Sequence, residues 1–257
     1  MTGPIRGRFD RAGATYEAAA RVQRVVARHL AELCPRALSG RVLEIGAGSG
    51  LLTRTLAPRL TLGGLYTALD ISPGMLENAA MPGAVKLAAD GERPPFRPET
   101  FDFLASASAM HWYADPAASI AADLRLLRPG GGFAIALYVE GTLGELEEAS
   151  RATGFGSVYP MRPAAYYRKL FAELTGGRVH IEERRHVVTY GSVGELLRAL
   201  KGAGVTHTPG VKVGSPSRYR DFVRFYEKRF GTGDTVETTY VVAMIRSQEA
   251  QRPGQPR

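Results

Sequence analysis

The amino-acid sequence predicts an α/β fold organised around a doubly wound, mostly parallel sheet. Between residues 41 and 138, short β-rich runs alternate with helical stretches. Strands that alternate with helices favour a parallel sheet with right-handed crossover connections. After residue 139 this alternation ends, and the remaining segments are expected to form further helices and two more strands.

An amphipathic helix over residues 14–33 is the first expected element. Its apolar side chains recur at spacings of three to four residues, at Val22, Val25, Val26, Leu30 and Leu33. Pro35 then blocks continuation of the helix, because proline has no backbone N–H and its ring clashes with the preceding turn.

Seven strands and seven further helices follow from the patterning of the rest of the chain. The strands are expected over residues 41–45, 64–69, 84–88, 101–107, 132–138, 179–190 and 235–245. The helices are expected over residues 51–60, 73–78, 116–127, 142–152, 163–174, 192–200 and 218–230. Ser192 is a candidate N-cap for the helix that it precedes.

The composition excludes several classes of protein. With 44% hydrophobic and 23% charged residues, the chain is close to globular averages, which excludes wholesale disorder and collagen. The single cysteine, Cys34, cannot form an internal disulfide and fits a reducing compartment. Residues 1–11 lack the apolar core of a secretory signal, and the longest apolar run, residues 133–139, is too short to cross a membrane. A cytoplasmic protein is expected.

The net charge of +8 is unevenly distributed along the chain. Residues 1–40 contain 7 basic and 3 acidic residues, and residues 151–230 contain 15 basic and 6 acidic residues. Residues 41–140, in contrast, contain 8 basic and 10 acidic residues. An acidic partner that docks on the two basic segments would explain this distribution, and so would an arginine-rich surface from a biased genome.

The most informative motif lies over residues 42–50, VLEIGAGSG, where an apolar strand ends in Glu44 and glycine then recurs at every second position. Glycine is needed where the backbone turns sharply or approaches a ligand closely. A dinucleotide-binding loop would have its last glycine at the position of Leu51, and a P-loop would need a Gly-Lys-Ser/Thr sequence that is absent here.

The spacing E-x-G-x-G-x-G resembles motif I of the class I S-adenosylmethionine-dependent methyltransferases. This resemblance implies a Rossmann-like seven-stranded sheet with a helical cap insertion, and S-adenosyl-L-methionine as cofactor with S-adenosyl-L-homocysteine as product. It also implies that the Glu44 carboxylate helps to hold the methionyl ammonium group. The loop that contacts the cofactor would comprise Gly46, Ala47, Gly48 and Gly50.

Acidic residues after the second and third strands strengthen this interpretation. Asp70 is placed to accept hydrogen bonds from both ribose hydroxyls, and Ile71 and Met75 could enclose the adenine. Asp90, followed by Gly91, is placed to accept a hydrogen bond from the adenine amino group. Each acid alone could be a helix cap or a surface residue, but three acids at successive strand ends favour a cofactor site. Ser106, in the fourth strand, is a further candidate contact.

The segments 101–113 and 126–132 resemble later motifs of the same superfamily, the second with the sequence LLRPGGG. The resemblance places His111 and Trp112 at the rim of the pocket, beside the transferred methyl group. His111 could alternatively be a packing residue, and Trp112 could pack against the following helix.

Segments outside these motifs resemble a narrower family, the malonyl-acyl-carrier-protein O-methyltransferases (BioC) of biotin synthesis. They are FDRA at residues 9–12, TYE at 15–17, Val22-Gln23, GTLGEL at 141–146, LKGAGVTH at 200–207 and Thr239-Tyr240. The resemblance implies methylation of the free carboxylate of a malonyl thioester, carried by an acidic acyl carrier protein or by coenzyme A. The sequence has no aromatic-interleaved basic run and no basic amphipathic helix of the membrane kind, so we expect no nucleic-acid or membrane partner. No metal is expected, and the oligomeric state stays open.

Such a substrate needs cationic and hydrogen-bonding partners. Arg162, Lys201 and His207 are the candidate cations, although each could be a solvated surface charge. Tyr16 and His111 are candidate catalytic residues that act as neutral hydrogen-bond donors, and Trp112 is a candidate substrate contact. A carboxylate is already deprotonated near pH 7, so the reaction requires no general base.

We expect a single domain over residues 1–246 and a flexible tail over residues 247–257. Within the domain, residues 1–40 would form an N-terminal helical cap and residues 41–140 the cofactor-binding half. Residues 141–230 would form the cap insertion and C-terminal elements, and residues 231–246 the last strand. Two alternatives remain: a methyltransferase for another small acid, a quinone or a polyketide-type intermediate, and a cofactor-binding regulatory protein without turnover.

Overall fold

The computed structural model describes Gly7, residues 16–204 and residues 214–248. Its centre is one eight-stranded sheet with the order β3-β2-β1-β4-β5-β8-β6, in which β7 also pairs with β8. The strands are β1 (Arg41–Ile45), β2 (Leu65–Asp70), β3 (Ala84–Ala88), β4 (Phe101–Ala107), β5 (Leu127–Tyr138), β6 (Val179–Tyr190), β7 (Gly231–Thr232) and β8 (Thr235–Ser247). The predicted α/β fold is confirmed, with β7 as an additional two-residue strand that is too short to leave a sequence pattern.

The direction of the strands explains where a ligand can bind. β1 to β5 are parallel, whereas β8 is antiparallel to both β5 and β6. The chain extends from β1 to β2 and β3 on one side, and then returns to β4 and β5 on the other. In sheets of this kind, ligands bind beyond the carboxyl ends of the strands where the order reverses. That point lies between β1 and β4.

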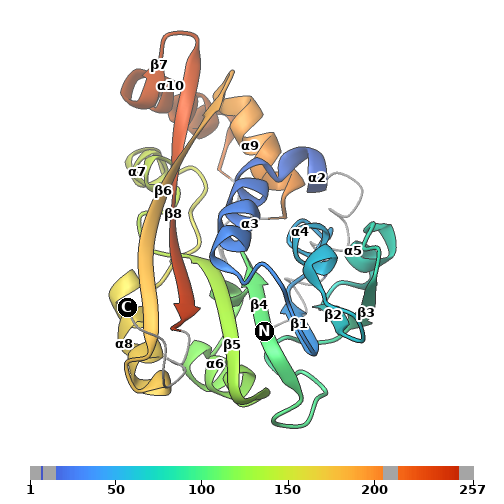
Figure 1. Ribbon diagram of the computed structural model, residues 1–257. Helices are drawn as coiled ribbons and strands as arrows, with labels where there is room; N and C mark the ends of the chain where they lie inside the picture. The colour runs from blue at the N-terminus through green and yellow to red at the C-terminus, as the bar shows by residue number, and fades with distance from the viewer. Residues whose placement is uncertain (1–6, 8–15, 205–213, 249–257) are drawn as a thin grey trace.

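Helices cover both faces of the sheet (Figure 1). They are α2 (Tyr16–Ala19), α3 (Arg21–Leu33), α4 (Thr53–Leu56), α5 (Pro73–Asn78), α6 (Pro116–Leu124), α7 (Gly144–Thr153), α8 (Ala164–Thr175), α9 (Val193–Gly202) and α10 (Pro216–Phe230). Two short 3₁₀ helices, η1 (Ala57–Arg59) and η2 (Met110–Trp112), lie between them. No helix in the described ranges is long and apolar enough to cross a membrane.

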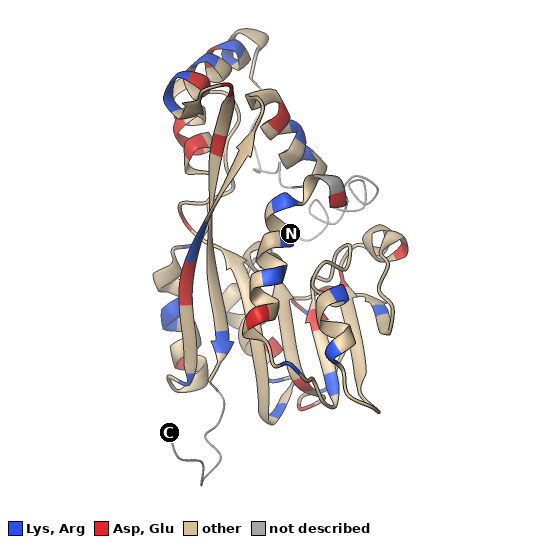
Figure 2. Cartoon of the chain, turned by 45° about the horizontal axis from the view of Figure 1, so that its top comes forward, with Lys and Arg blue, Asp and Glu red and all other residues tan. Residues whose placement is uncertain are grey.

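The paired strands β6 and β8 extend beyond the end of β5, as Figure 1 shows. The pairing of β5 with β8 stops at Tyr138 and Val242, but β8 continues its pairing with β6 as far as Val236. Helices α7 and α10 pack against this extension. Figure 2 marks several Lys and Arg positions along α10 at this end of the molecule.

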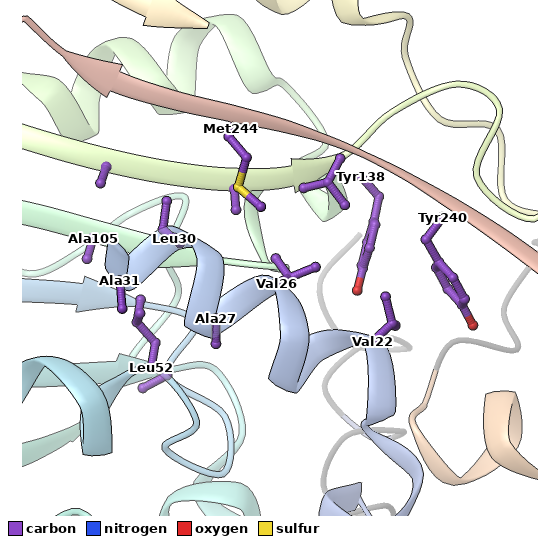
Figure 3. Close-up of a cluster of buried hydrophobic side chains, with 14 of the residues drawn as sticks. Val22, Val26, Ala27, Leu30, Ala31, Leu52, Ala105, Tyr138, Tyr240 and Met244 are labelled. Atoms are coloured by element: carbon purple, nitrogen blue, oxygen red, sulfur yellow. The ribbon is translucent and has the colours of Figure 1, made fainter. Parts of the chain in front are cut away.

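Two apolar clusters form the core, one on each face of the sheet. Strand residues alternate between the clusters, because successive side chains of a strand point to opposite faces: Val42 belongs to one and Leu43 to the other. Helix α3 contributes its apolar stripe to the first cluster, where Val26 and Leu30 are fully buried. Figure 3 shows this stripe facing side chains of β5 and β8, among them Tyr138.

Three expected helices differ from those of the structure by more than two residues at one end or by an interruption. The helix expected over residues 14–33 is divided into α2 and α3 at Ala20, whose ψ of 49° is not helical. The helix expected over residues 51–60 is reduced to α4 and the 3₁₀ turn η1, because Pro58 supplies no N–H for a continuing α-helix. Helix α6 ends at Leu124, and strand β5 begins three residues later at Leu127. A register shift opposite Phe101 and Phe103 accommodates the glycine-rich start of β5, which lies ahead of the strand expected over residues 132–138.

Candidate active site

A cavity lies at the carboxyl ends of β1, β2 and β4. Its walls include most of the site residues that the sequence predicts, namely Tyr16, Glu44, Gly46, Ala47, Gly48, Asp70, Ile71, Met75, Asp90, Gly91 and Trp112. Three acids that are far apart in the sequence therefore meet in one concave site. A concave site with a few convergent polar groups is typical of small-molecule binding.

The glycines after β1 are required by the backbone and by close packing. Gly46 has a φ of 76°, and a Cβ atom at this position would lie 2.1 Å from the Cβ of Ala109. Its N–H donates to the carbonyl of Leu69 at 2.8 Å, which ties the end of β1 to the end of β2. Gly48 also has a positive φ, of 55°. The loop therefore presents bare backbone to the cavity.

Asp70 holds the glycine loop and the start of α5 in a fixed relation. Its Oδ2 accepts a hydrogen bond from the N–H of Gly48 at 2.7 Å, and its Oδ1 accepts one from the N–H of Ser72 at 2.8 Å. Ser72 in turn caps α5, because its hydroxyl accepts from the N–H of Met75 at 3.1 Å. One carboxylate thus organises the backbone on two sides of the cavity.

Glu44 is buried at the floor of the cavity, with 1% of its surface exposed. Its Oε2 accepts hydrogen bonds from the hydroxyls of Thr53, at 2.6 Å, and Tyr66, at 2.7 Å. Burial raises the pKa of Glu44 to about 7, although the two hydrogen bonds oppose the shift. The carboxyl group is therefore close to half-protonated at neutral pH, and a cation in the cavity would favour its ionised form.

The segment 90–92 after β3 is fixed to the N-terminal end of α6. The Glu92 carboxylate accepts hydrogen bonds from the N–H of Ala114, at 3.1 Å, and from the hydroxyl of Ser119, also at 3.1 Å. Within the segment, the N–H of Glu92 donates to Oδ1 of Asp90 at 3.0 Å. The Tyr113 hydroxyl lies 3.0 Å from the carbonyl oxygen of Gly91. These contacts hold Asp90 at the cavity wall.

Helices α2 and α3 close the cavity from the N-terminal side. Gln23 lines the cavity, and its buried Oε1 atom has no hydrogen-bond partner among the described residues. Burial raises the pKa of the Tyr16 hydroxyl well above its ordinary value, so this cavity-lining group stays a neutral donor. A salt bridge between Glu17 and Arg54 joins α2 to α4, and the Arg54 guanidinium also donates to the carbonyl of Ser49 in the glycine loop.

Trp112 lies at the cavity wall, whereas the neighbouring His111 does not line it. The His111 ring is buried between Trp112 and Tyr138, with ring centroids 5.0 and 4.9 Å away. Burial lowers the pKa of His111 to about 3, so its imidazole is neutral, and neither ring nitrogen has a hydrogen-bond partner within the described ranges. In this geometry His111 supports the two aromatic rings.

Three further predicted residues, Ser106, Arg162 and Lys201, do not line the cavity. Ser106 is fully buried in β4 and does not line the cavity, whereas its neighbour Ala107 does. Successive side chains of a strand point to opposite faces of the sheet, so Ser106 points to the other face. Arg162 and Lys201 are exposed, and the Arg162 guanidinium lies over the ring of Tyr166 at 4.6 Å. Two predictions lie outside the described residues: His207 and the tail beyond residue 248.

Gly50 has a different function from the other glycines of the loop. It does not line the cavity, but it has a φ of 85°, and a Cβ atom there would lie 2.8 Å from the Cγ of Met81. Its N–H donates to the carbonyl of Ala47 at 2.9 Å. Gly50 therefore closes the turn into α4 and fixes the loop indirectly.

Several cavity residues were not predicted from the sequence. They are Gln23, Ala27, Ile45, Ser49, Leu51, Leu52, Leu69, Glu92, Ala107, Ser108, Ala109 and Tyr113. Gln23 does carry a signal, because it is a polar residue beside Val22 and Val26 on the buried face of α3. Glu92 and Tyr113 carry none, since their contacts join segments more than 20 residues apart.

Comparisons with known proteins agree with the fold and the loop. Residues 43–135 match a family described as a methyltransferase domain. A malonyl-acyl-carrier-protein O-methyltransferase from Porphyromonas gingivalis is 34% identical over 91% of this chain and 90% of its own length. The biotin biosynthesis bifunctional protein BioCD from Bordetella avium is 39% identical over 79% of this chain, which spans 44% of that longer protein.

Among solved structures, phosphoethanolamine N-methyltransferase 2 from Haemonchus contortus, in complex with S-adenosylhomocysteine, superposes with a TM-score of 0.58. The two sequences are 18% identical, and the match covers 96% of this chain and 61% of the other. This similarity concerns the fold, which is that of a Rossmann-like methyltransferase.

Proposed function

Because this chain belongs to the malonyl-acyl-carrier-protein O-methyltransferase family, we infer that it is an S-adenosylmethionine-dependent methyltransferase that esterifies the free carboxylate of a malonyl thioester in biotin synthesis. The products are the methyl ester and S-adenosyl-L-homocysteine. The observation that carries this assignment is the meeting of the glycine loop, Asp70 and Asp90 with Tyr16 and Trp112 in one cavity. Mass spectrometry of a malonyl carrier protein incubated with enzyme and cofactor tests it.

The chemistry of the cavity fits the cofactor. The bare backbone of Gly46 and Gly48 permits close approach of the methionyl part, and Glu44 offers a carboxylate to its ammonium group. Asp70 would hold the ribose hydroxyls, and Asp90 the adenine amino group. The Oε1 of Gln23, which has no hydrogen-bond partner among the described residues, is a buried acceptor that a bound molecule can satisfy.

The enzyme's task in this reaction is alignment and the exclusion of water. When bound, S-adenosylmethionine supplies an electrophilic methyl group with a good leaving group. The substrate carboxylate is ionised near neutral pH, so no residue has to remove a proton from it. The neutral Tyr16 hydroxyl would orient the carboxylate, and the Trp112 ring would form the wall beside it. Positioning of this kind contributes up to roughly 7–11 kcal/mol to catalysis.

Replacement of the cation that anchors the malonyl carboxylate is expected to raise KM for the substrate and leave cofactor affinity unchanged. The candidates are Arg162, Lys201 and His207, each to be replaced by alanine. Arg97→Ala serves as the control, because Arg97 is exposed and precedes the start of β4, at the end of the strand opposite the cavity. Steady-state kinetics and calorimetric titration of S-adenosylhomocysteine measure the two quantities. Unchanged KM values in all three variants would remove these residues from the substrate site.

The helical end of the molecule is suited to an acidic carrier protein. Helix α10 exposes Arg218, Arg220, Arg224, Lys228 and Arg229. Helices α3 and α9 also carry exposed basic residues, and Figure 2 marks Lys and Arg positions along all three helices. Complementary charge accelerates the encounter of partners and is screened by salt. We therefore assign carrier docking to this basic surface of α3, α9 and α10.

Turnover of the carrier-bound substrate is expected to fall at least about fivefold in kcat/KM when NaCl rises from about 0.05 to 0.5 M, because salt screens exposed charges. A malonyl thioester of pantetheine, which lacks the protein surface, is the matched control and should respond much less. Equal salt dependence for both substrates would exclude a docking role for the basic surface.

A further inference from the structure

A buried carboxyl group behind the cavity has no part in the function described so far. Asp123 on α6 has no exposed surface, and its Oδ2 lies 2.8 Å from the Tyr113 hydroxyl. Its Oδ1 has no hydrogen-bond partner in the described part of the chain. The same Tyr113 hydroxyl lies 3.0 Å from the carbonyl oxygen of Gly91, in the segment that positions Asp90.

The number of protons in this chain of contacts limits its arrangement. A tyrosine hydroxyl has one proton to donate, and the carbonyl oxygen of Gly91 can only accept. If Tyr113 donates to Gly91, then Asp123 must be protonated and must donate to the Tyr113 oxygen. If Asp123 is ionised, Tyr113 donates to it, and the bond to Gly91 is lost.

Burial and charge favour the protonated arrangement. Burial raises the pKa of Asp123 to about 8, and the nearby carboxylates of Glu92 and Asp90 act in the same direction, against the hydrogen bond from Tyr113. Tyr113, Glu92 and Asp90 are the titratable groups that shift the pKa of Asp123. An ionised Asp123 would also leave a buried, charged oxygen that has no partner within the described ranges, which is costly in an apolar interior.

We propose that Asp123 is a protonated positioning residue, which donates to Tyr113 so that Tyr113 can hold the Gly91 carbonyl and keep Asp90 in place for the adenine of the cofactor. This proposal rests on the proposed function, because it assumes that the segment 90–92 contacts the cofactor. The close packing supports a mechanical link: a Cβ atom on Gly91 would lie 3.1 Å from the Tyr113 oxygen and 2.8 Å from Cγ2 of Ile45.

Loss of the Asp123 proton should therefore weaken cofactor binding at alkaline pH. Ionisation withdraws the Tyr113 proton from Gly91 and places a negative charge beside Asp90 and Glu92. The loss of one neutral hydrogen bond corresponds to about three- to tenfold in affinity. We expect this decrease in affinity between about pH 7 and 9.5, a range that brackets the raised pKa of Asp123.

Calorimetric titration of the whole chain with S-adenosylhomocysteine tests the proposal. Asp123→Asn keeps a donor for Tyr113 and cannot ionise, so its affinity at pH 7 should stay within about threefold of wild type. The ratio of wild-type to variant affinity should then fall about three- to tenfold by pH 9.5. Titration of the ligand's own amino group affects both proteins equally. Tyr113→Phe should bind more weakly at both pH values, and the exposed Asp221→Asn variant should match wild type.

Thermal unfolding without cofactor gives a second readout of the same proton. An aspartate in the unfolded chain ionises at about pH 3.9. A folded wild type that keeps Asp123 protonated therefore loses stability relative to Asp123→Asn as pH rises from about 4 to 8. A difference in melting temperature that is independent of pH would overturn the proposal.

The two measurements separate this proposal from the proposed function. Failure of the wild type to bind S-adenosylhomocysteine at pH 7 would contradict the cofactor site itself. Normal binding at pH 7 with a constant wild-type to Asp123→Asn ratio up to pH 9.5 would contradict only the positioning role of Asp123. If Asp123→Asn fails to fold, the wild-type and Tyr113→Phe titrations decide, because only the wild type should lose additional affinity at alkaline pH.

Discussion

Replacement of Asp70 by alanine is expected to lower the affinity for S-adenosylmethionine by at least about a hundredfold. The cofactor's ribose hydroxyls would lose the carboxylate that accepts their hydrogen bonds, and each hydrogen bond to a charged group contributes about 1.5–3 kcal/mol. The variant also frees the N–H groups of Gly48 and Ser72, which Asp70 holds at 2.7 and 2.8 Å. Calorimetric titration with S-adenosylmethionine measures the loss.

Asp102 provides the matched control for this experiment. It is also an aspartate of the central sheet, but it lies at the start of β4, where it accepts hydrogen bonds from the Arg41 N–H and the Arg128 guanidinium. Asp102→Ala should bind the cofactor as wild type does. Near-normal binding by Asp70→Ala would show that Asp70 does not contact the ribose.

The second large effect is expected at Glu44, and it depends on pH. Burial raises the pKa of Glu44 to about 7 in the free protein, and the methionyl ammonium group would bind its ionised form. Affinity for the cofactor should therefore be greatest above pH 7 and fall toward tenfold for each pH unit below it. Binding near pH 7 should also release a proton, which titrations in buffers of different ionisation enthalpy detect.

Glu44→Gln should remove both effects. The amide keeps the shape and the contacts to Thr53 and Tyr66, but it cannot pair with a cation, so affinity at pH 8 should fall about ten- to a hundredfold. The affinity that remains should not change with pH between 6 and 8, the range in which Glu44 of the wild type titrates. Glu173→Gln, on the exposed side of α8, is the control. A wild-type affinity that is constant over this range would contradict contact between Glu44 and the ammonium group.

The sequence was sufficient for the positions of the strands along the chain and for the acids at their ends. Alternation of apolar runs defines β1 to β5, and the parallel direction of these strands places Glu44, Asp70 and Asp90 at one edge. The glycine spacing was equally informative, because a positive φ at Gly46 is a local requirement that only glycine meets easily.

The remaining site residues depend on tertiary contacts. Tyr113 and Asp123 meet Gly91 only because α6 folds back against the segment after β3. The raised pKa of Glu44 results from burial, against the hydrogen bonds from Thr53 and Tyr66, and no spacing in the sequence indicates this environment. Ser106, in contrast, was expected to contact the cofactor but does not line the cavity. It lies at the carboxyl end of β4, but strand alternation turns its side chain away from the cavity.

The most direct test of the account is the transfer of one methyl group to a malonyl thioester. Purified protein, S-adenosylmethionine and malonyl carrier protein are incubated together, and the intact carrier is weighed by mass spectrometry, with acetyl carrier protein as the control. We predict that the malonyl carrier gains the mass of one methyl group, that alkaline ester hydrolysis removes it, and that the acetyl carrier is unchanged. Cofactor binding without any gain in mass on the malonyl carrier would contradict the proposed reaction.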